Sequence, residues 1–300
     1  GVSIIAVGDF YQLPPVKGKS LITPGNIEAN MVFTSLFKMV ELTEVMRQKD
    51  DAAFANMLNR IRKRKKGEPL LESDREMLQS RNNRADKNED ALHVYALNAP
   101  VDEMNDQKLD MLSGNTGKSI HESQAQDFRK NANGDMQKLL QPVKAPKSSL
   151  LPLLRLCVGA PVMLLRNLDV DDGLANGVIG KTKGFKLNDG GGNEIGKVYV
   201  EFNENTIGQK RKIGSGQQKG CIEIDRHEEN LLGHMSNITR RQIPLRLCWA
   251  STIHKTQGMS LKAIVVSCRN IRNHGQAYVA FSRAQTLDGL FITDFNIDAI

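Results

Sequence analysis

The stretch GDFYQLPPV, residues 8–16, follows directly on an apolar run at residues 2–7. This run predicts a fully buried strand of a parallel sheet. Open α/β sheets bind ligands at the edge where their strands end, and Gln12 lies at that edge. A glutamine amide can sense a phosphate or position a water molecule during nucleotide hydrolysis. An ordinary exit from strand to loop explains the stretch equally well, so other segments have to decide.

Helical and strand patterns alternate along most of the remaining chain. The predicted helices cover residues 51–66, 73–80 with Ser73 as N-cap, 98–112 and 275–283. The predicted strands cover residues 92–97, 160–166, 243–250, 263–268 and 289–293. Residues 113–150 are polar and rich in Pro, Lys and Ser, which predicts a long loop. The alternation is typical of an α/β fold.

The region from Gly177 to Arg241 has a different pattern. Glycines are dense there, and residues 197–202 and 221–226 alternate with period two. The run NDGGGN at residues 188–193 is a turn signal. We therefore predict a small all-β insert in this region, with a barrel as its architecture.

Composition narrows the possible functions. The 300-residue chain has a formal net charge of +7 and a pI of about 9.2, which favours a polyanionic partner such as nucleic acid. It has no apolar run of about 18 residues, the length that a membrane-spanning helix needs. The cysteines form no CxxC pair, which disfavours a zinc site and indicates reduced core residues of an intracellular protein. They are Cys157, Cys221, Cys248 and Cys268.

Two arginines raise the question of an anionic ligand. Arg283 is a single cation in the apolar helical segment YVAFSRA, residues 278–284. Such a cation requires either an anionic ligand or a buried carboxylate partner. Arg47 stands before a predicted helix in LTEVMRQ, residues 42–48. For an isolated arginine of this kind, a structural ion pair is the commoner role.

Two further polar segments have both a functional and a structural interpretation. WASTIHKTQGMS, residues 249–260, places short donors after a predicted strand, near a helix N-terminus. That composition suits a phosphate backbone, but an ordinary capped helix shares it. The basic run at residues 60–66 could contact phosphate or act as a nuclear localisation signal. Most often such a run is only the solvated end of a helix.

Four of these segments, taken in order, resemble a known family. GDFYQLPPV, LTEVMRQ, WASTIHKTQG and YVAFSRA resemble motifs III, IV, V and VI of the Pif family of superfamily-one DNA helicases, which includes helicase domains of Helitron transposons. Residues 92–98 resemble the family's strand and asparagine before the VDEMN helix. Residues 159–168 and 173–177 resemble its GAPVMLLxN and NG stretches. The resemblance covers nearly the whole chain.

The resemblance implies a RecA-like α/β helicase core, in which two RecA-like domains hold ATP in their cleft. Residues 1–40 would be the C-terminal remnant of the first RecA-like domain. Residues 41–178 and 246–300 would form the second, and residues 179–245 would form a small SH3-like β insert that lies over the DNA.

The resemblance also assigns roles to individual residues. Gln12 would sense the γ-phosphate of ATP, and Arg47 and Arg283 would be arginine fingers, whose removal costs on the order of 10³–10⁵ in turnover. The other expected nucleotide contacts are Gly8, Asp9, Gln257 and Gly258. The expected contacts with single-stranded DNA are Phe10, Pro14, Pro15, Asn98, Ser251, Thr252, His254 and Lys255. Phe10 and Tyr11 could stack on bases or pack under their own loop.

Motifs I, Ia and II of the family have no counterpart in these residues. A nucleotide motor needs a P-loop for the phosphates and an acidic pair for Mg²⁺. The run GNTGKS at residues 114–119 does not qualify, because Leu112 stands where the first glycine belongs and a helix precedes it. We therefore expect a fragment that begins after motif II and does not hydrolyse ATP alone. Most ligands of ATP and Mg²⁺ would lie outside it, and it would hold no metal itself.

The expected activity is that of an ATP-dependent helicase moving 5′ to 3′ on single-stranded DNA and DNA forks. The family resemblance connects it with DNA repair, recombination and telomere maintenance. We expect a monomer, without a membrane, in the nucleus or alternatively the mitochondrion. Two other functions stay open: a nucleic-acid-binding remnant of a helicase or transposon, and a nucleotide-independent RNA-binding protein. The last would leave Gln12, Arg47 and Arg283 without a common purpose.

Overall fold

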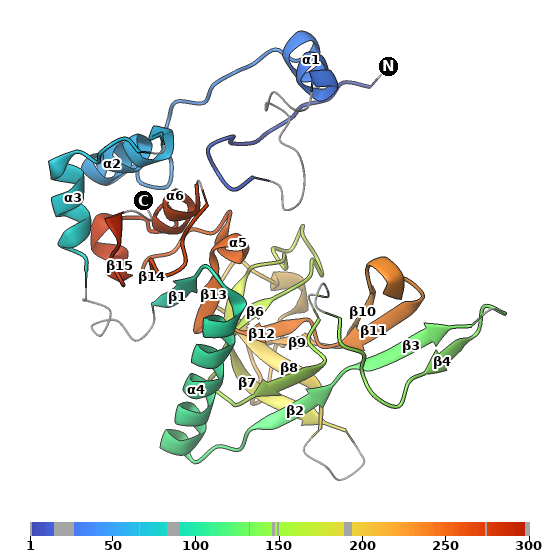
Figure 1. Ribbon diagram of the computed structural model, residues 1–300. Helices are drawn as coiled ribbons and strands as arrows, with labels where there is room; N and C mark the ends of the chain where they lie inside the picture. The colour runs from blue at the N-terminus through green and yellow to red at the C-terminus, as the bar shows by residue number, and fades with distance from the viewer. Residues whose placement is uncertain are drawn as a thin grey trace. The chain divides into compact units, whose positions relative to one another are not determined.

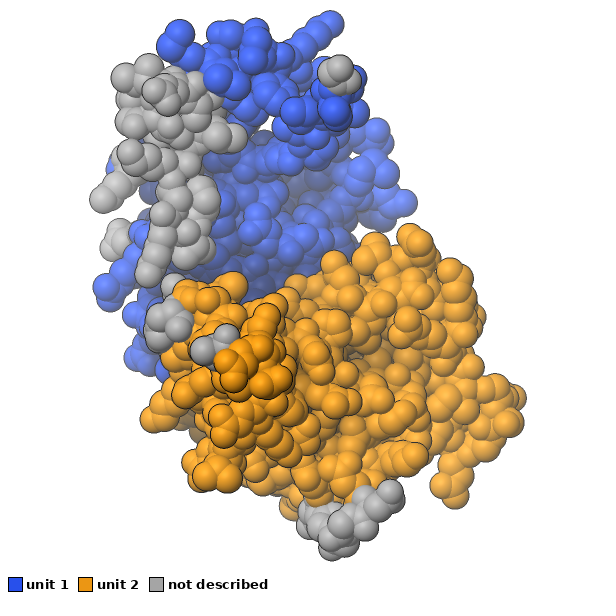
Figure 2. Space-filling model, turned by 90° about the vertical axis from the view of Figure 1, so that its right-hand side faces the viewer, with its two compact units in different colours: residues 1–101, 251–300 blue, residues 102–250 orange. Residues whose placement is uncertain are grey.

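The chain divides into two compact units. Unit 1 comprises residues 1–101 and 251–300, and unit 2 comprises residues 102–250 (Figure 2). The computed structural model describes residues 2–14, 27–65, 67–82, 91–131, 133–145, 148, 150–188, 194–273 and 275–297. Within these ranges no helix is long and apolar enough to cross a membrane.

Unit 1 is built on a four-stranded sheet in the order β13-β1-β14-β15 (Figure 1). β1 pairs in parallel with β14, and β14 pairs in parallel with β15. All of β14 is buried, as expected for a central strand of a parallel sheet. The strands are β13 (Ala250–Thr252), β1 (Leu92–Tyr95), β14 (Ile264–Ser267) and β15 (Leu290–Thr293). The sheet confirms the α/β prediction and three of its strands.

The helices of unit 1 include α2, which begins at an N-cap that the sequence encodes. The carboxylate of Asp51 accepts from the N–H of Phe54 at 3.0 Å, and its other oxygen accepts from the N–H of Leu287 at 2.9 Å. The apolar stripe predicted for this helix is buried, and α2 packs on α6. The helices are α1 (Ile27–Leu36), α2 (Ala52–Lys63), α3 (Glu72–Gln79), α5 (Ile253–Thr256), α6 (Gln276–Phe281) and the 3-10 helix η4 (Leu287–Gly289).

Two predictions for unit 1 are wrong, and one helix was not predicted. Residues 2–7 form no strand, and Val2 is 91% exposed. A β-strand needs a hydrogen-bonded neighbour, and no described residue pairs with this run. Ser73 is not a helix cap, because α3 begins at Glu72 after Leu71, whose side chain makes no capping bond. The helix α1 was not expected from the sequence.

Unit 2 contains most of α4 (Asn98–Thr116) and an all-β region of described strands in three antiparallel sheets (Figure 1). The largest sheet has the order β12-β6-β7-β8-β9 and encloses an apolar core. The second has the order β10-β11-β3-β4, and β2 pairs with β5. The strands are β2 (His121–Gln124), β3 (Gln126–Lys130), β4 (Met136–Lys138), β5 (Leu153–Leu156), β6 (Pro161–Leu164), β7 (Ile179–Leu187), β8 (Ile195–Phe202), β9 (Ile222–Ile224), β10 (His227–Asn230), β11 (Ile238–Gln242) and β12 (Leu245–Leu247), with the 3-10 helices η2 (Gln209–Arg211) and η3 (Gly233–Met235).

The all-β region starts earlier than predicted. The prediction of a loop at residues 113–150 is wrong, because α4 continues to Thr116 and three strands follow it. Polar residues fill the buried positions of these strands, and this hid the pattern: Ser123 donates to Gln242 at 2.9 Å. The two compact units therefore have other boundaries than the predicted domains. The predicted strand at 243–250 is divided into β12 and the first residue of β13.

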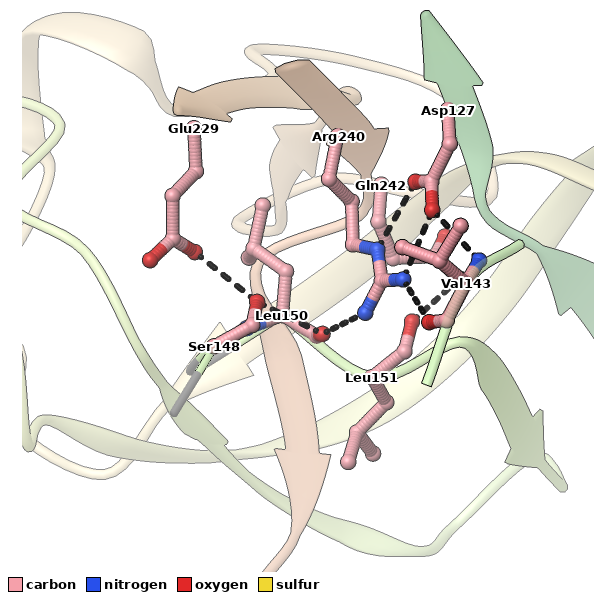
Figure 3. Close-up of polar contacts among 8 residues, drawn as sticks. All are labelled: Asp127, Val143, Ser148, Leu150, Leu151, Glu229, Arg240 and Gln242. Carbon is pink, nitrogen blue, oxygen red and sulfur yellow. Dashed lines mark hydrogen bonds and ion pairs between the residues drawn. The ribbon is translucent and has the colours of Figure 1, made fainter. Parts of the chain in front are cut away.

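A buried polar network holds the second sheet of unit 2 to the backbone of Val143, Leu150 and Leu151 (Figure 3). Arg240 pairs with Asp127, and both side chains are completely buried. The guanidinium of Arg240 also donates to the carbonyl oxygens of Val143 at 2.5 Å and Leu150 at 3.1 Å. Every polar group in this pair is thus satisfied, which is the condition for burying charge. The four cysteines are buried and free, as predicted.

Candidate functional site

The first part of the candidate site is Arg283, which follows the end of α6. Its side chain is almost completely buried. Its Nε donates to the carbonyl oxygen of Val279 at 2.8 Å, and its Nη2 donates to the hydroxyl of Ser282 at 2.8 Å. Its Nη1 donates to the carbonyl oxygen of Met259 at 3.4 Å. These contacts fix the guanidinium with neutral partners.

Arg47 reaches the same place from a distant segment, because it contacts Ser282, 235 residues later in the chain. Its Nη1 donates to the carbonyl oxygen of Ser282 at 3.2 Å, and its Nε donates to the hydroxyl of Ser260 at 2.8 Å. The neighbouring Gln48 is buried, and its amide donates to the carbonyl oxygens of Ser282 at 3.2 Å and Ala284 at 2.6 Å. The RQ dipeptide therefore docks on the backbone that carries Arg283.

The two arginines form a cationic site that lacks a counter-charge among the described residues. Burial lowers the pKa of Arg283, and together with the positive charge of Arg47 it brings this pKa to about 10. Burial also lowers the pKa of Arg47. Among the residues that the structure describes, no carboxylate pairs with either one. Of the two explanations for a cation in YVAFSRA, the buried carboxylate is therefore not found, and an anionic ligand is the one that fits.

Gln12 lies in a turn that contacts Gln257 and passes close to Gly275 at the start of α6. Its Nε2 donates to a carboxylate oxygen of Asp9 at 3.2 Å, and its Oε1 accepts from Nε2 of Gln257 at 3.1 Å. Because an ionised carboxylate can only accept, Asp9 fixes which end of the Gln12 amide is the donor. The structure thus brings together three residues predicted to contact the nucleotide.

Arg62 of α2 holds this turn from the other side. Its Nη2 pairs with Asp9 at 2.9 Å, and its guanidinium lies 5.0 Å from the centre of the Tyr11 ring. Its Nε is buried without a hydrogen-bond partner among the described residues. Arg60, two residues earlier, pairs with Asp74 instead. The basic run is therefore partly used in internal ion pairs, and Lys66 lies outside the described residues.

Tyr278 of α6 lies among the same charges. Burial raises the pKa of its phenol, which therefore stays neutral at physiological pH and adds no negative charge. The charged groups that act on it are Arg62, Asp9, Arg283 and Arg47. This places the arginines and the Gln12 turn around one polar site in unit 1.

The residues predicted to contact DNA are spread over several environments. Ser251 and Thr252 are buried at the end of β13, whereas His254 is exposed on α5 and Lys255 is half-buried. Asn98 is exposed as the first residue of α4. The two short hydroxyl side chains are therefore less accessible than the sequence suggested.

The aromatic and proline candidates lie next to the Gln12 turn. Phe10 is half exposed and meets Phe33 edge-on, with ring centres 5.6 Å apart. Phe10 therefore packs against Phe33, and the exposed half of its side chain is accessible to a base. Pro14 is exposed, and Pro15 lies outside the described residues.

The glycines of the predicted site differ in what they require. Gly258 has a φ of +88°, a conformation that favours glycine. Gly8 is exposed and has room for a side chain. Sequence reasoning missed Gly275, which has a φ of +79° and lies against the Gln12 turn: a Cβ there would be 2.9 Å from the carbonyl oxygen of Tyr11 and 3.0 Å from that of Gln12. Its position before a helix was the available signal.

Neither a P-loop nor a metal cluster is found in the described part of the chain. Residues 114–116 are the last residues of α4, so the run GNTGKS begins inside a helix, whereas a P-loop follows a strand. No group of three or more His, Cys, Asp or Glu side chains could hold a metal ion there. The site thus offers cations and an oriented amide, not metal ligands.

Comparison with known proteins finds similar helicases. Residues 148–185 match the family model for the DNA helicase Pif1, 2B domain. The chain is 33% identical over 307 residues to the ATP-dependent DNA helicase PIF1 of Danio rerio, covering 99% of this chain and 41% of the relative. It is 31% identical over 309 residues to the ATP-dependent DNA helicase PIF1 of Homo sapiens, covering 100% of this chain and 42% of the relative. The chain therefore spans about two fifths of the length of these relatives.

Solved structures show the same relationship. The Pif1 helicase of Candida albicans matches with a TM-score of 0.71 and 25% identity, covering 98% of this chain and 64% of that one. Bacteroides Pif1 bound to ssDNA matches with a TM-score of 0.63 and 23% identity, covering 98% and 62%. The latter likeness shows the fold alone, the RecA-like core that the motifs implied. By its motifs, its fold and its relatives, the chain is similar to Pif1 helicases along almost its whole length.

Proposed function

We propose that this chain supplies one side of the ATP site and part of the DNA path of an ATP-dependent helicase that moves 5′ to 3′ along single-stranded DNA and opens forks. The observation that carries the proposal is the pair of arginines, Arg47 and Arg283, held without a carboxylate partner among the described residues. A Bacteroides relative has been solved with ADP-AlF3 and ssDNA, and another structure concerns forked dsDNA. Both support the choice of ligands.

The chemistry follows from the donors present. ATP would supply the phosphoanhydride bond whose hydrolysis drives movement. Arg47 and Arg283 would place fixed positive charge where negative charge develops on phosphate oxygens, which is the usual source of catalysis in phosphoryl transfer. The Oε1 of Gln12 would exchange the hydrogen bond that it accepts from Gln257 for one from water, and the second N–H of its amide would donate to phosphate, while Asp9 keeps the amide oriented. Since the described residues hold no metal cluster, we derive no step through Mg²⁺ from this chain.

The DNA part of the proposal rests on charge and exposure. The net charge of +7 favours binding to phosphates. The exposed candidates near the Gln12 turn and on α5 are Phe10, Pro14 and His254. We further propose a monomer that acts in DNA repair, recombination and telomere maintenance, located in the nucleus with the mitochondrion as alternative. Imaging of a fluorescent fusion distinguishes the two compartments.

DNA-stimulated ATP hydrolysis tests the proposal. The complete natural protein that contains these residues should hydrolyse ATP when single-stranded DNA is added. Arg283→Ala should reduce turnover on the order of 10³- to 10⁵-fold, as expected for an arginine finger. Arg60→Ala removes a cation of α2 that pairs with Asp74 and should leave turnover unchanged. Wild-type protein without DNA-stimulated turnover would contradict the motor.

The 300-residue chain alone gives a second measurement. It contains no P-loop sequence, so we expect it to bind single-stranded DNA without hydrolysing ATP. Turnover by this chain that is sensitive to Arg283→Ala would overturn the requirement for a P-loop. A second candidate function, nucleic-acid binding without a motor, is favoured by the same sequence observation. It would be supported if the complete natural protein bound DNA and lacked turnover.

A further inference from the structure

The outward face of the sheet β10-β11-β3-β4 in unit 2 has no role in the site described above. Its register is set by the buried pair, because Arg240 stands directly opposite Asp127 on the neighbouring strand. Thr239 stands opposite Phe128. Since successive residues of a strand point to opposite faces, the buried pair fixes Thr239 and Phe128 on the outward face.

Phe128 lies within a row of side chains that crosses this outward face. The row runs through the four strands as Asn230, Thr239, Phe128 and Lys138. Asn230 and Lys138 are exposed, and Phe128 is half-buried and is not part of the apolar core of unit 2. The hydroxyl of Thr239 donates to the side-chain oxygen of Asn230 at 2.8 Å. An aromatic ring therefore stands between a polar pair and a lysine.

Positive charge surrounds the ring. Lys130 lies two residues along β3 on the same face, and Arg241 lies opposite Gln126. Lys130, Lys138 and Arg241 are exposed. Glu228, opposite Arg241, is the one carboxylate at the described outward positions of these strands. The face thus combines three cations, one anion and an aromatic ring.

This combination suits one class of partner. Single-stranded nucleic acid offers unpaired bases that stack on aromatic rings and phosphates that bind cations, whereas a duplex hides its base faces. We propose that the outward face binds single-stranded DNA, with a base stacked on Phe128 and phosphates held by Lys130, Lys138 and Arg241. The inference rests on the proposed function only for its choice of DNA as the substrate.

The opposite face of the sheet explains why the platform would be rigid. Arg240 and Asp127 bond to each other there, and Arg240 also bonds to the backbone at Val143 and Leu150 (Figure 3). On β10, Glu229 faces the same side and pairs with Arg166 at 2.5 Å. Because these contacts hold the strands in place, the side chains on the outward face keep a constant position. Less conformational entropy is then lost when a ligand binds.

Binding of the 300-residue chain to labelled oligo(dT) of about 16 nucleotides, followed by fluorescence anisotropy, tests the platform. Phe128→Leu keeps an apolar side chain and removes the ring, so binding should weaken roughly five- to a hundredfold. Phe128→Trp should bind at least as tightly as wild type. A ring that only packs against protein would give the opposite order, because leucine fits a packed site better than tryptophan does. Unchanged thermal melting shows that each variant is folded.

The contribution of the cations is tested by measuring how the binding affinity depends on salt concentration. Lys138→Ala should reduce the slope of log affinity against log salt by about 0.7, the value for one phosphate of a single strand. The matched control is Lys197→Ala, because Lys197 on β8 is already paired with Glu223 at 2.6 Å and should leave the slope unchanged. If Phe128→Leu bound DNA with wild-type affinity, the proposed binding face would be overturned but the proposed function would not. If the chain bound oligo(rU) more tightly than oligo(dT), DNA would be overturned as the ligand of this face. Absence of DNA binding in the wild type would overturn the platform and the proposed function together.

Discussion

Arg240 and Asp127 form a two-pronged ion pair in which both side chains are completely buried: the Nε–Oδ1 and Nη2–Oδ2 distances are both 2.8 Å. Asp127→Asn keeps the shape and leaves the buried guanidinium without its counter-charge. We expect the free energy of unfolding to fall by about 3–5 kcal/mol, measured by urea denaturation of the chain. Glu223→Gln, which breaks an exposed pair with Lys197, should lower the free energy of unfolding far less, because water and salt screen that pair. Equal losses in both variants would contradict the distinction.

Arg283 is also almost completely buried, but its replacement should change the free energy of unfolding only slightly. Arg283→Gln removes a charge that has no carboxylate partner among the described residues, and it also removes three hydrogen bonds to neutral groups. These effects oppose each other, so the free energy of unfolding should change by less than about 1.5 kcal/mol. ATP turnover of the complete natural protein should nevertheless fall on the order of 10³-fold or more. A large loss of stability would make Arg283 a structural residue.

The lowered pKa of Arg283 predicts a pH dependence. In the folded chain burial and the neighbouring charge of Arg47 lower this pKa to about 10, whereas the unfolded chain keeps the higher, ordinary pKa of an arginine. Between these values the unfolded chain binds more protons, so this group makes the free energy of unfolding rise with pH. The stability of wild type relative to Arg283→Gln should therefore increase from about pH 9 to about pH 11. Chemical denaturation at both pH values measures it, and a relative decrease would contradict the assignment.

The ion pair between Arg62 and Asp9 predicts a positioning role. Arg62→Ala should free the Gln12 turn, because Asp9 would lose its partner and Tyr11 its covering guanidinium. Hydrogen exchange of the peptide covering residues 9–12 should become faster, and turnover of the complete natural protein should fall more than its KM for ATP rises. Arg62→Lys should restore part of both effects, since lysine keeps the charge.

The control for Arg62 lies on the same helix. Arg60→Ala breaks the pair with Asp74 and should lower stability without changing exchange at residues 9–12. If both variants changed exchange alike, the effect would belong to α2 as a whole.

Gly275 predicts a second way to disturb the same turn. In Gly275→Ala the new methyl group would meet the carbonyl oxygens of Tyr11 and Gln12 at about 3 Å, so the turn has to move. Gly67→Ala is a matched control, because Gly67 also has a positive φ, of +88°, but has nothing within 4 Å of the added atom. Both should lose about 1 kcal/mol of stability from backbone strain. Faster hydrogen exchange at residues 9–12 is expected in Gly275→Ala alone.

The sequence predicted the elements whose pattern depends on local chemistry. Asp51 as a cap and the apolar stripe of α2 are local signals, and the strand that became β14 is a continuous apolar run. The polar strands of unit 2 could not be recognised, because Ser123 and Asp127 occupy buried positions that a pattern search expects to be apolar. Their partners, Gln242 and Arg240, lie more than 100 residues later.

The candidate site shows the same limit. Motif residues such as Gln12 and Arg283 were found because their order resembles a family. Arg62 and Gly275 were missed because neither is conspicuous by itself: Arg62 stands in a basic run, and its contact with Asp9 spans 53 residues. Burial of Ser251 depended on the sheet around it, which no single segment reveals. Contacts between distant parts of the sequence therefore decide which residues can bind a ligand and which residues support them.

The amide of Gln48 has a consequence for the speed of ligand capture. It bonds to the backbone on either side of Arg283, while the guanidinium of Arg47 is held by Ser260 and the carbonyl oxygen of Ser282. An arginine side chain carries about 2 kcal/mol of rotamer entropy, and here most of it is lost on folding. An arriving phosphate group therefore meets donors that are already in place, so its association needs no slow search among side-chain conformations.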